Sequence, residues 1–345
     1  MALLEGTMRL AGLSLACAFI GLLCSGAADE PTSWEGELSE NLVKGQPATA
    51  LIPNGNGDVR TVHYVNVNGL AVSGGDMVLG RHEQLQVISR LSFMMLASKV
   101  EASALSPELQ ASVKKIDKSA LSTQFDAQIK FFGFGIANRA WPTRTIPYRI
   151  DASITDAALK NAIGEGIARW NATGVVSFVN EAAASPSLRA KTHSLVFLDD
   201  VGSGFSCQAR VGYAPAAADQ NVWLNPGCQA GNIQHEIGHS LGLYHEHMRD
   251  DRTDYVTIAA AIPKSDPNFG IGVGTFYTSY DLCSIMHYPE SSKLQLTAVG
   301  KAGLATCQKS LPDQKAECVN LGQRCQLSPS DLASVRARFK DTPQT

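Results

Sequence analysis

Three histidines lie in one short stretch, at spacings that suit a single metal ion. The stretch runs from His235 to Glu246 and reads H-E-x-x-H-x-x-G-x-x-H-E. His235 and His239 are four residues apart, so on a helix they share one face, with Cβ atoms about 5–6 Å apart. Gly242 can adopt a positive φ, which ends the helix and turns the chain so that His245 becomes a third ligand. Three imidazoles with one open position are typical of a catalytic zinc site.

Glu236, next to the first histidine, completes the chemistry that this arrangement indicates. Zinc lowers the pKa of a bound water to about 7. The Glu236 carboxylate can then take the proton, and the resulting hydroxide can attack an electrophilic carbonyl. A bare H-E-x-x-H arises easily by chance, but the added glycine and third histidine at fixed spacing make a chance match improbable. The motif therefore predicts a zinc-dependent hydrolase.

Length and composition are those of an ordinary globular protein. The 345 residues are 44% hydrophobic and 18% charged, with a formal net charge of −3. This length is enough for about two domains. The charge balance does not indicate binding to nucleic acid or to a membrane.

Residues 1–28 have the pattern of a secretory signal peptide. Arg9 precedes an apolar run from Leu10 to Leu23, and residues 25–28 offer small side chains for cleavage. A membrane anchor is less favoured because the apolar run is too short to span a bilayer. The even number of cysteines beyond the signal predicts disulfides and hence a secreted, extracellular protein. These cysteines are Cys207, Cys228, Cys283, Cys307, Cys318 and Cys325.

The segment that follows the signal carries neither cysteines nor a catalytic constellation. Residues 29–60 are rich in Gly, Pro and Asn and are predicted as loop. Residues 61–72 favour a β-hairpin, and helices are predicted at 82–98 and, more weakly, at 106–118. Gly74-Gly75-Asp76, between the hairpin and the first helix, is typical of a turn.

The elements around the histidine motif predict a mixed sheet backed by helices. Strands are expected at residues 145–150, 175–179, 195–198 and 220–225. A helix at 153–170, started by Thr155 or Asp156, falls between the first two strands, and a last helix starts at Ser328. This order of strands and helices predicts an α+β fold.

The motif, together with a later turn, resembles the astacin family of metzincin zinc endopeptidases. Glu246 directly follows the third histidine, and Ser284-Ile285-Met286-His287-Tyr288 is similar to the methionine turn. Further matches occur at Trp141-Pro142, at residues 146–148, 249–256 and 322–324, and at Leu327-Ser328. The resemblance covers about residues 131–340. It implies a metzincin-type protease domain, in which a twisted mixed β-sheet carries an active-site helix and a C-terminal helix, preceded by a propeptide.

The resemblance also implies a role for each matching residue. The implied zinc ligands are His235, His239 and His245. Glu236 would be the general base, and Tyr288 would sit on zinc at rest and swing away to help zinc stabilise the oxyanion. Met286 would support the site without binding metal, and Glu246 would reach the new N-terminus after maturation. Without the family, Tyr288 would be interpreted as a core residue and His287 as a second possible ligand. His247 and the remaining histidines are interpreted as surface or structural residues.

Gly75-Asp76 is similar to the end of the family's propeptide motif, whose aspartate occupies the zinc in the latent enzyme. Ser73 stands where that motif has phenylalanine. The alternative is an ordinary Gly-Gly-Asp turn. The first interpretation predicts a zymogen with a signal peptide at 1–28, a propeptide at 29–130 and a catalytic domain at 131–345.

The cysteines match the family only in part. Cys207 and Cys228 match a family disulfide, but the partner that a second family disulfide needs near residues 170–185 is missing. The four remaining cysteines allow three pairings. Zinc also accepts thiolate ligands, although the motif already supplies enough donors. These four are Cys283, Cys307, Cys318 and Cys325.

Three functions fit these residues. The leading one is a secreted, monomeric zinc endopeptidase that acts on protein or peptide substrates. An extended substrate would pair with the strand around residues 222–224. Another metzincin branch would share the chemistry, but Tyr288 and Glu246 argue against it. The third is a binding or adhesion protein that keeps the fold but has no activity. Every zinc ligand and catalytic residue is present, so the sequence does not support this third function.

Overall fold

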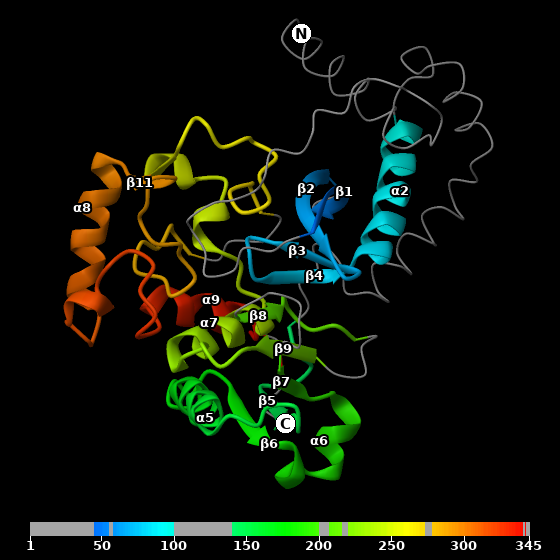
Figure 1. Ribbon diagram of the computed structural model, residues 1–345, viewed down its shortest axis with the longest axis vertical. Coiled ribbons are helices and arrows are strands. Elements are labelled where there is room, and N and C mark those ends of the chain that lie inside the picture. Colours follow the sequence, from blue (N-terminus) through cyan, green and yellow to red (C-terminus); the bar gives the residue numbers. More distant parts are fainter. Residues whose placement is uncertain are drawn as a thin grey trace, which may run out of the picture. The chain divides into compact units, whose positions relative to one another are not determined.

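The computed structural model describes residues 45–54, 58–99, 140–199, 207–215, 220–272, 278–340 and 342. The expected signal peptide, the weaker helix at 106–118 and the boundary near residue 130 lie outside these ranges. We refer to the described part of 45–99 as the N-terminal lobe and to the described part of 140–340 as the C-terminal lobe. Figure 1 labels the helices and strands of both.

The N-terminal lobe is an antiparallel meander of four strands followed by one helix. The predicted hairpin is present, and it turns at Asn68 and Gly69, whose φ angles of 50° and 85° suit a tight two-residue turn. The predicted helix is also present, and Figure 1 shows it running beside the first two strands. The elements are β1 (Gln46–Asn54), β2 (Asp58–Val67), β3 (Leu70–Ser73), β4 (Met77–Arg81) and α2 (His82–Lys99).

Strand β1 corrects the prediction that residues 29–60 are loop throughout. The loop was predicted because proline usually interrupts a strand, and this segment contains Pro47 and Pro53. Among the described strands, β1 lies at the edge of the sheet and pairs with β2 alone, so a missing N–H can be tolerated there. Burial of Ala50 and Ile52 in a core shared with Leu85 of α2 favours the strand.

The C-terminal lobe contains the mixed sheet that the sequence predicts. Three of its strands match the expected ranges closely, and the one expected at 175–179 is shifted by about one residue. The remaining strand, with only four residues and no alternation of buried and exposed positions, was not predicted. The strands are β5 (Thr145–Ile150), β6 (Ser177–Asn180), β7 (Leu195–Asp199), β8 (Cys207–Arg210) and β9 (Gln220–Leu224).

The two lobes share one nine-stranded sheet. Its order is β1-β2-β3-β4-β8-β9-β7-β5-β6. The link between the lobes is the parallel pair of β4 with β8, in which Met77 lies opposite Ala209. Strand β9 pairs with β8 on one side and β7 on the other. The expectation that a substrate pairs with residues 222–224 is therefore wrong, because β9 has no free edge.

Two helices form the framework behind the histidine motif. Helix α5 (Ala157–Asn171) begins after Asp156, whose side chain accepts the backbone N–H of Leu159. It packs against α7 (Ala230–Ser240), where Gly166 leaves room for Ile233. The buried Trp170 of α5 donates its indole N–H to the Gln234 carbonyl.

The last helix, α9, begins after Ser328 as predicted, with a capping box between Ser328 and Asp331. Val335 and Phe339 join the core at its inner side. The other elements are α6 (Pro186–Lys191), β10 (Val256–Ile258), β11 (Leu294–Leu296), α8 (Ala298–Cys307) and α9 (Pro329–Arg338). Short 3-10 turns cover Glu181–Ala183, Glu246–Met248, Arg252–Asp254, Gln308–Ser310 and Ala316–Cys318.

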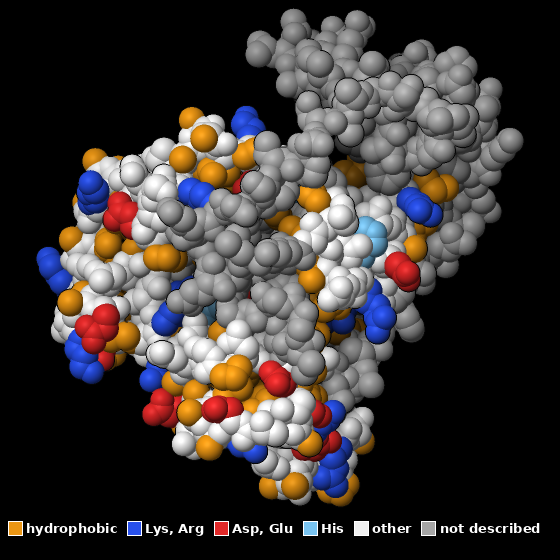
Figure 2. All heavy atoms as spheres, in the orientation of Figure 1, with side chains coloured by type: hydrophobic (Ala, Val, Ile, Leu, Met, Phe, Trp, Pro, Cys, Tyr) orange, Lys and Arg blue, Asp and Glu red, His pale blue; other side chains and the backbone are white. Residues whose placement is uncertain are grey.

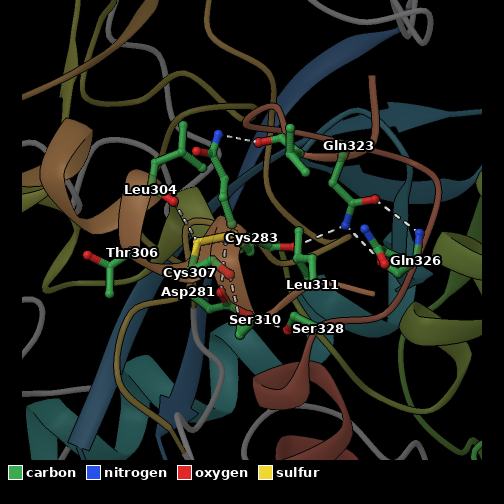
Figure 3. The surroundings of a disulfide bond; sticks show 12 residues. Asp281, Cys283, Leu304, Thr306, Cys307, Ser310, Leu311, Gln323, Gln326 and Ser328 are labelled. Atoms are coloured by element: carbon green, nitrogen blue, oxygen red, sulfur yellow. Dashed lines mark hydrogen bonds between the residues drawn. A yellow bond between two sulfur atoms is a disulfide. The ribbon is translucent and has the colours of Figure 1, made fainter. Parts of the chain in front are cut away.

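All six cysteines beyond residue 28 are paired, which decides among the three pairings. The disulfides are Cys207–Cys228, Cys283–Cys307 and Cys318–Cys325. Figure 3 shows the second of these beside Gln323, whose side chain donates to the carbonyls of Cys283 and Gln326. None of the six is thus a thiolate that could bind the metal.

Neither the described helices nor the charged surface favours a membrane or nucleic-acid partner. Within the described ranges, no helix combines the length and hydropathy that crossing a bilayer requires. On the face drawn in Figure 2, acidic and basic side chains are interspersed over the coloured surface. They do not gather there in one basic field of the kind that binds nucleic acid.

Candidate active site

Helix α7 and the turn after it bring the three motif histidines together. His235 and His239 lie on one face of α7 and are buried. The helix ends before Gly242, which adopts a φ of 98° and donates its N–H to the His239 carbonyl. The chain reverses at this glycine, as predicted, and places the buried His245 opposite the other two.

The spacing of the three imidazoles fits a tetrahedral zinc ion. His245 Nε2 lies 3.2 Å from His235 Nε2 and 3.2 Å from His239 Nε2. Ligands at the usual Zn–N distance around a tetrahedral ion are about 3.3–3.4 Å apart. The three nitrogens thus surround a point at ordinary zinc-binding distance from each.

Hydrogen bonds on the far side of two rings set their protonation. His235 Nδ1 donates to the Ile285 carbonyl at 2.8 Å, and His239 Nδ1 donates to the Leu243 carbonyl at 2.8 Å. With Nδ1 donating to a carbonyl, Nε2 of each ring points at the shared centre. Burial lowers the pKa of His235 well below its usual range and that of His245 to about 4, so both are neutral at pH 7. Lone pairs that converge in this way require a cation between them.

Asp76 supplies a carboxylate at the same centre. Its Oδ1 lies 3.1 Å from His245 Nε2 and 3.4 Å from His239 Nε2, while Oδ2 lies 3.4 Å from His235 Nε2. The residue is 6% exposed, and Oδ1 has no hydrogen-bond partner among the described residues. A buried carboxylate whose two oxygens face three imidazole nitrogens fits the fourth position of the same ion. Asp76 is thus next to the three histidines, as the zymogen interpretation requires.

Glu236 is buried beside this cluster with one oxygen unused. It is 1% exposed, and Oε2 makes no hydrogen bond to the described part of the chain. Burial, and secondly the charge of Asp76, raise the pKa of Glu236 well above its usual range. A bound dication opposes that rise. The carboxyl group is therefore placed to take up and return a proton beside the ion.

Tyr288 faces the N-terminal lobe. Its hydroxyl donates a short hydrogen bond to the Gly74 carbonyl. Its ring lies against the rings of His247 and His245, with centroids 3.9 Å and 4.7 Å away. Burial raises the pKa of Tyr288 well above its usual range, so the phenol keeps the proton that it donates.

One side of the segment around Asp76 is held by strand β8. The Ala209 N–H donates to the Asp76 carbonyl at 3.1 Å, and the Val211 N–H donates to the Val78 carbonyl at 3.1 Å. Ala209 lies in β8, the strand at the N-terminal-lobe side of the C-terminal sheet, and Val211 directly follows that strand. Any extended peptide that replaced the segment would meet the same donors.

The other side of the segment meets a turn of the C-terminal lobe. The Pro267 carbonyl accepts the Gly74 N–H at 2.8 Å and the Ser73 hydroxyl at 3.1 Å. Gly74 has a φ of 62°, and a Cβ there would lie 2.7 Å from His245 Nδ1. The approach of the backbone to the imidazole therefore requires glycine at this position.

The methionine turn lies beneath α7. Met286 Sδ is 2.8 Å from where a Cβ on Gly238 would be, so the sulfur fills the space that the glycine leaves. His287 bonds to the Tyr280 hydroxyl through Nε2 and to the Tyr288 carbonyl through Nδ1. Both nitrogens of His287 are occupied, and the alternative of His287 as a metal ligand is wrong.

Glu246 belongs to a separate polar cluster. It accepts the Asp281 N–H at 2.7 Å, and Arg249 lies 3.4 Å away. Burial raises its pKa to about 8 even with that guanidinium beside it. The residues near 131, which the resemblance implies as its partners after maturation, lie outside the described ranges.

Two residues of the site were not singled out from the sequence. Arg324 donates to the carbonyls of Ile285 and His287 and so ties the C-terminal segment to the methionine turn. Its place in the matching stretch 322–324 was the available signal. His247, considered a surface or structural residue, is fully buried against Tyr288. Its position next to the motif was the only hint.

Comparison with protein families gives one match over this part of the chain. The family model described as Astacin, which is a peptidase family, matches residues 135–340, well over half of the 345 residues. The match includes every residue discussed above except those of the N-terminal lobe.

Relatives of known sequence agree with the family model. Nematocyst expressed protein 6 from Nematostella vectensis is 30% identical over 213 residues, covering 59% of this chain and 66% of that protein. Zinc metalloproteinase dpy-31 from Teladorsagia circumcincta is 31% identical over 231 residues, covering 64% of this chain and 34% of that protein. The matched region thus spans less than two thirds of either relative.

Among solved structures, High choriolytic enzyme 1, a hatching enzyme zinc-protease from Oryzias latipes, is similar to the chain. It has a TM-score of 0.43 at 23% identity, with 59% of this chain and 96% of that chain covered. A likeness at this level carries no argument about function.

Proposed function

Because the chain belongs to the astacin family of peptidases, we propose that it is a zinc-dependent endopeptidase acting on protein or peptide substrates. The observation that carries the proposal is the convergence of three buried imidazoles beside a buried carboxyl group. His235, His239 and His245 would hold the ion, and Glu236 would move the proton.

The proposed chemistry divides between the metal and this chain's own residues. Zinc, when bound, supplies a Lewis acid that polarises the scissile carbonyl and acidifies water. Glu236 takes a proton from the attacking water and returns it to the leaving amine, which its raised pKa supports. The Tyr288 phenol, which keeps its proton, donates a hydrogen bond to the oxyanion that forms.

Strand β8 is the proposed docking edge for the substrate. Its Ala209 and the following Val211 present backbone N–H groups to an extended chain, as they do to residues 76 and 78 here. Main-chain hydrogen bonds of this kind give affinity without selecting side chains. On the opposite side, the Pro267 carbonyl offers an acceptor to a substrate N–H.

We also propose that the propeptide, residues 29–130, holds this site latent. Three contacts of the N-terminal lobe support the idea. Asp76 occupies the fourth position beside the histidines, β4 covers β8, and the Gly74 carbonyl takes the Tyr288 hydroxyl. The ion, the docking edge and the oxyanion donor would all be blocked at once.

Export from the cell is the third part of the proposal. All six cysteines beyond residue 28 are in disulfides, which persist in oxidising compartments. The apolar run expected as a signal peptide at residues 1–28 agrees with this. We propose a secreted protein that acts outside the cell as a monomer.

Casein cleavage by the processed, zinc-loaded protein tests the enzymatic proposal. Glu236→Gln keeps the size of the side chain but cannot take a proton, so we expect kcat to fall at least about 1000-fold with zinc retained. A chelator should abolish activity, and added Zn²⁺ should restore it. N-terminal sequencing of the active form locates the boundary expected near residue 130.

The same measurements separate the enzyme from a binding or adhesion protein with this fold. Such a protein would bind zinc but cleave nothing in a broad peptide library, with or without Glu236. Zinc retention without any cleavage by the processed parent would contradict the proposed activity.

A further inference from the structure

His247 forms the closest ring contact of Tyr288. The two rings are nearly parallel, with centroids 3.9 Å apart and planes at 25°. Phe269 meets the Tyr288 ring edge-on, with centroids 6.1 Å apart and planes at 89°. His247 is fully buried, so this stack excludes water and restricts the rotation of the phenol ring.

A single hydrogen bond anchors the His247 ring. Nε2 donates to the Asn268 carbonyl at 2.7 Å, while Nδ1 has no hydrogen-bond partner within the described ranges. Asn268 is itself fixed, because its N–H donates to Asp266 Oδ1 at 2.7 Å. The Asp266 carbonyl also accepts the Gly270 N–H at 2.8 Å, which closes the turn. The plane of the His247 ring is thus set by a small, well-bonded turn.

The same turn contacts the chain that lies in the cleft. The Pro267 carbonyl accepts the Gly74 N–H, and the Tyr288 hydroxyl donates to the Gly74 carbonyl. Both backbone polar groups of one peptide residue are therefore bound, one by the turn and one by the phenol. Gly74 here stands in for a residue of any peptide that occupies the cleft.

We propose that His247 is a positioning residue for the peptidase reaction. Its ring holds the Tyr288 phenol in the pose in which the hydroxyl faces the carbonyl oxygen of a peptide in the cleft. This inference rests on the proposed function, in which that hydroxyl stabilises the oxyanion. A donor that is held in place loses less entropy when charge develops, and a displacement of even about 1 Å would weaken its contribution.

Three substitutions at His247 separate its ring from its hydrogen bond, using processed, zinc-loaded protein and a fluorogenic peptide. His247→Ala removes both, so kcat should fall about 10-fold while KM changes less than about 2-fold. His247→Phe keeps a ring to stack and should stay within about 3-fold of the parent. His247→Gln can donate to the Asn268 carbonyl but offers no ring, and it should resemble His247→Ala.

A double-variant comparison shows whether His247 acts through Tyr288. Tyr288→Phe has no hydroxyl to position, so adding His247→Ala to it should change kcat by less than about 2-fold. If the kcat losses of the two single variants instead multiply in the double variant, the proposal is overturned. His193→Ala is the matched control, because His193 stacks on Tyr213 with centroids 4.5 Å apart and planes at 11°, away from the Tyr288 stack. It should leave kcat within about 2-fold of the parent.

The outcomes distinguish this inference from the proposed function. If Tyr288→Phe is as active as the parent, the proposed role of the hydroxyl is wrong. If Tyr288→Phe is slow but the His247 losses multiply with it, only the positioning role is wrong. Should His247→Ala not fold or not retain zinc, the other two variants decide, since a fully active Gln variant and a slow Phe variant contradict the proposal.

Discussion

At the scale of single residues, buried carboxyl groups are a recurrent feature of the C-terminal lobe. Asp331 caps α9 and accepts the N–H groups of Ile285 and Ser328 at 3.1 Å and 2.9 Å. Burial, and secondly the nearby Asp281, raise its pKa to about 7. Asp331 thereby ties α9 to the methionine turn, and a carboxyl group with a raised pKa makes the stability of that junction depend on pH.

The sign of the dependence follows from proton uptake. An unfolded aspartate titrates near its ordinary value of 3.8, whereas Asp331 in the folded chain titrates at about 7. Between these values the folded state binds more protons, so this group's contribution to stability is greatest below about pH 4 and is lost as the pH rises to about 7. The side chain in Asp331→Asn has no proton to lose, so the stability of this variant does not fall with pH through this group.

Thermal unfolding of the full chain at about pH 5 and about pH 8 checks this prediction. The variant loses part of the cap, so it is expected to be less stable than the parent at the lower pH. The difference in unfolding temperature between the parent and Asp331→Asn should narrow or reverse at the higher pH. An unchanged difference at the two pH values would contradict the raised pKa.

At the scale of elements, the packing of α7 against the C-terminal segment is closer than side chains allow. Gly231, in the first turn of α7, lies so near the Arg324 backbone that a Cβ would be 1.7 Å from its carbonyl oxygen. The close approach lets Arg324 reach the Ile285 carbonyl under the site. The glycine therefore positions the helix that carries His235 and His239.

Gly231→Ala tests this contact. Neither backbone can give way cheaply, so we expect a loss of at least about 3 kcal/mol in the free energy of unfolding. Gly164→Ala on α5 is the control, because nothing lies within 4 Å of its would-be Cβ. That change should stabilise the protein by about 0.5–1 kcal/mol. Denaturant unfolding of both variants measures the difference, and equal stabilities would refute the close contact.

At the scale of the whole chain, the two lobes meet through a shared sheet and at the three histidines. Strand β4 continues the C-terminal sheet, and Asp76 stands immediately before it. The junction is not close-packed throughout. A cavity of about 180 Å³ remains between the lobes, lined in part by His63, Met77 and Met248. Water can enter this pocket, so the lobes bury less area against each other there, which agrees with the proposed release of the N-terminal lobe.

Asp76→Ala is expected to weaken latency. The variant leaves the fourth position beside the histidines open, while β4 still covers β8, so the unprocessed chain should gain about 10-fold or more in peptide cleavage without reaching processed levels. Cleavage of a small fluorogenic peptide by the uncleaved chain, with its length checked by mass spectrometry, measures the gain.

Asp250→Ala provides the matched control for Asp76. It removes an exposed ion pair with Arg60 between the same two lobes, and exposed pairs contribute little. It should leave the unprocessed chain as inactive as the parent. If Asp76→Ala is equally inactive, Asp76 is not the residue that maintains latency.

Prediction from sequence was most successful where local patterns decide. The bounds of β5 and α2, the turn between β2 and β3 and the start of α9 were found. Apolar spacing, Asn68-Gly69 and the Ser328 cap, which predict them, act over a few residues. It failed for β1 and β8, whose residues favour a strand only once neighbouring strands supply hydrogen bonds. The wrong substrate strand had the same cause, since sheet order depends on long-range pairing.

The sequence by itself determined the chemistry of the centre. The spacing of His235, Glu236 and His239, with a glycine that permits a turn to His245, predicts a metal and a base, because helix geometry alone sets those distances. Only the tertiary structure decided what surrounds that centre. Asp76 and Tyr288 reach it from distant segments, and His247 is buried against the tyrosine by a turn that no local pattern marks. Contacts between distant segments depend on the packing of the whole sheet, which residue spacing does not encode.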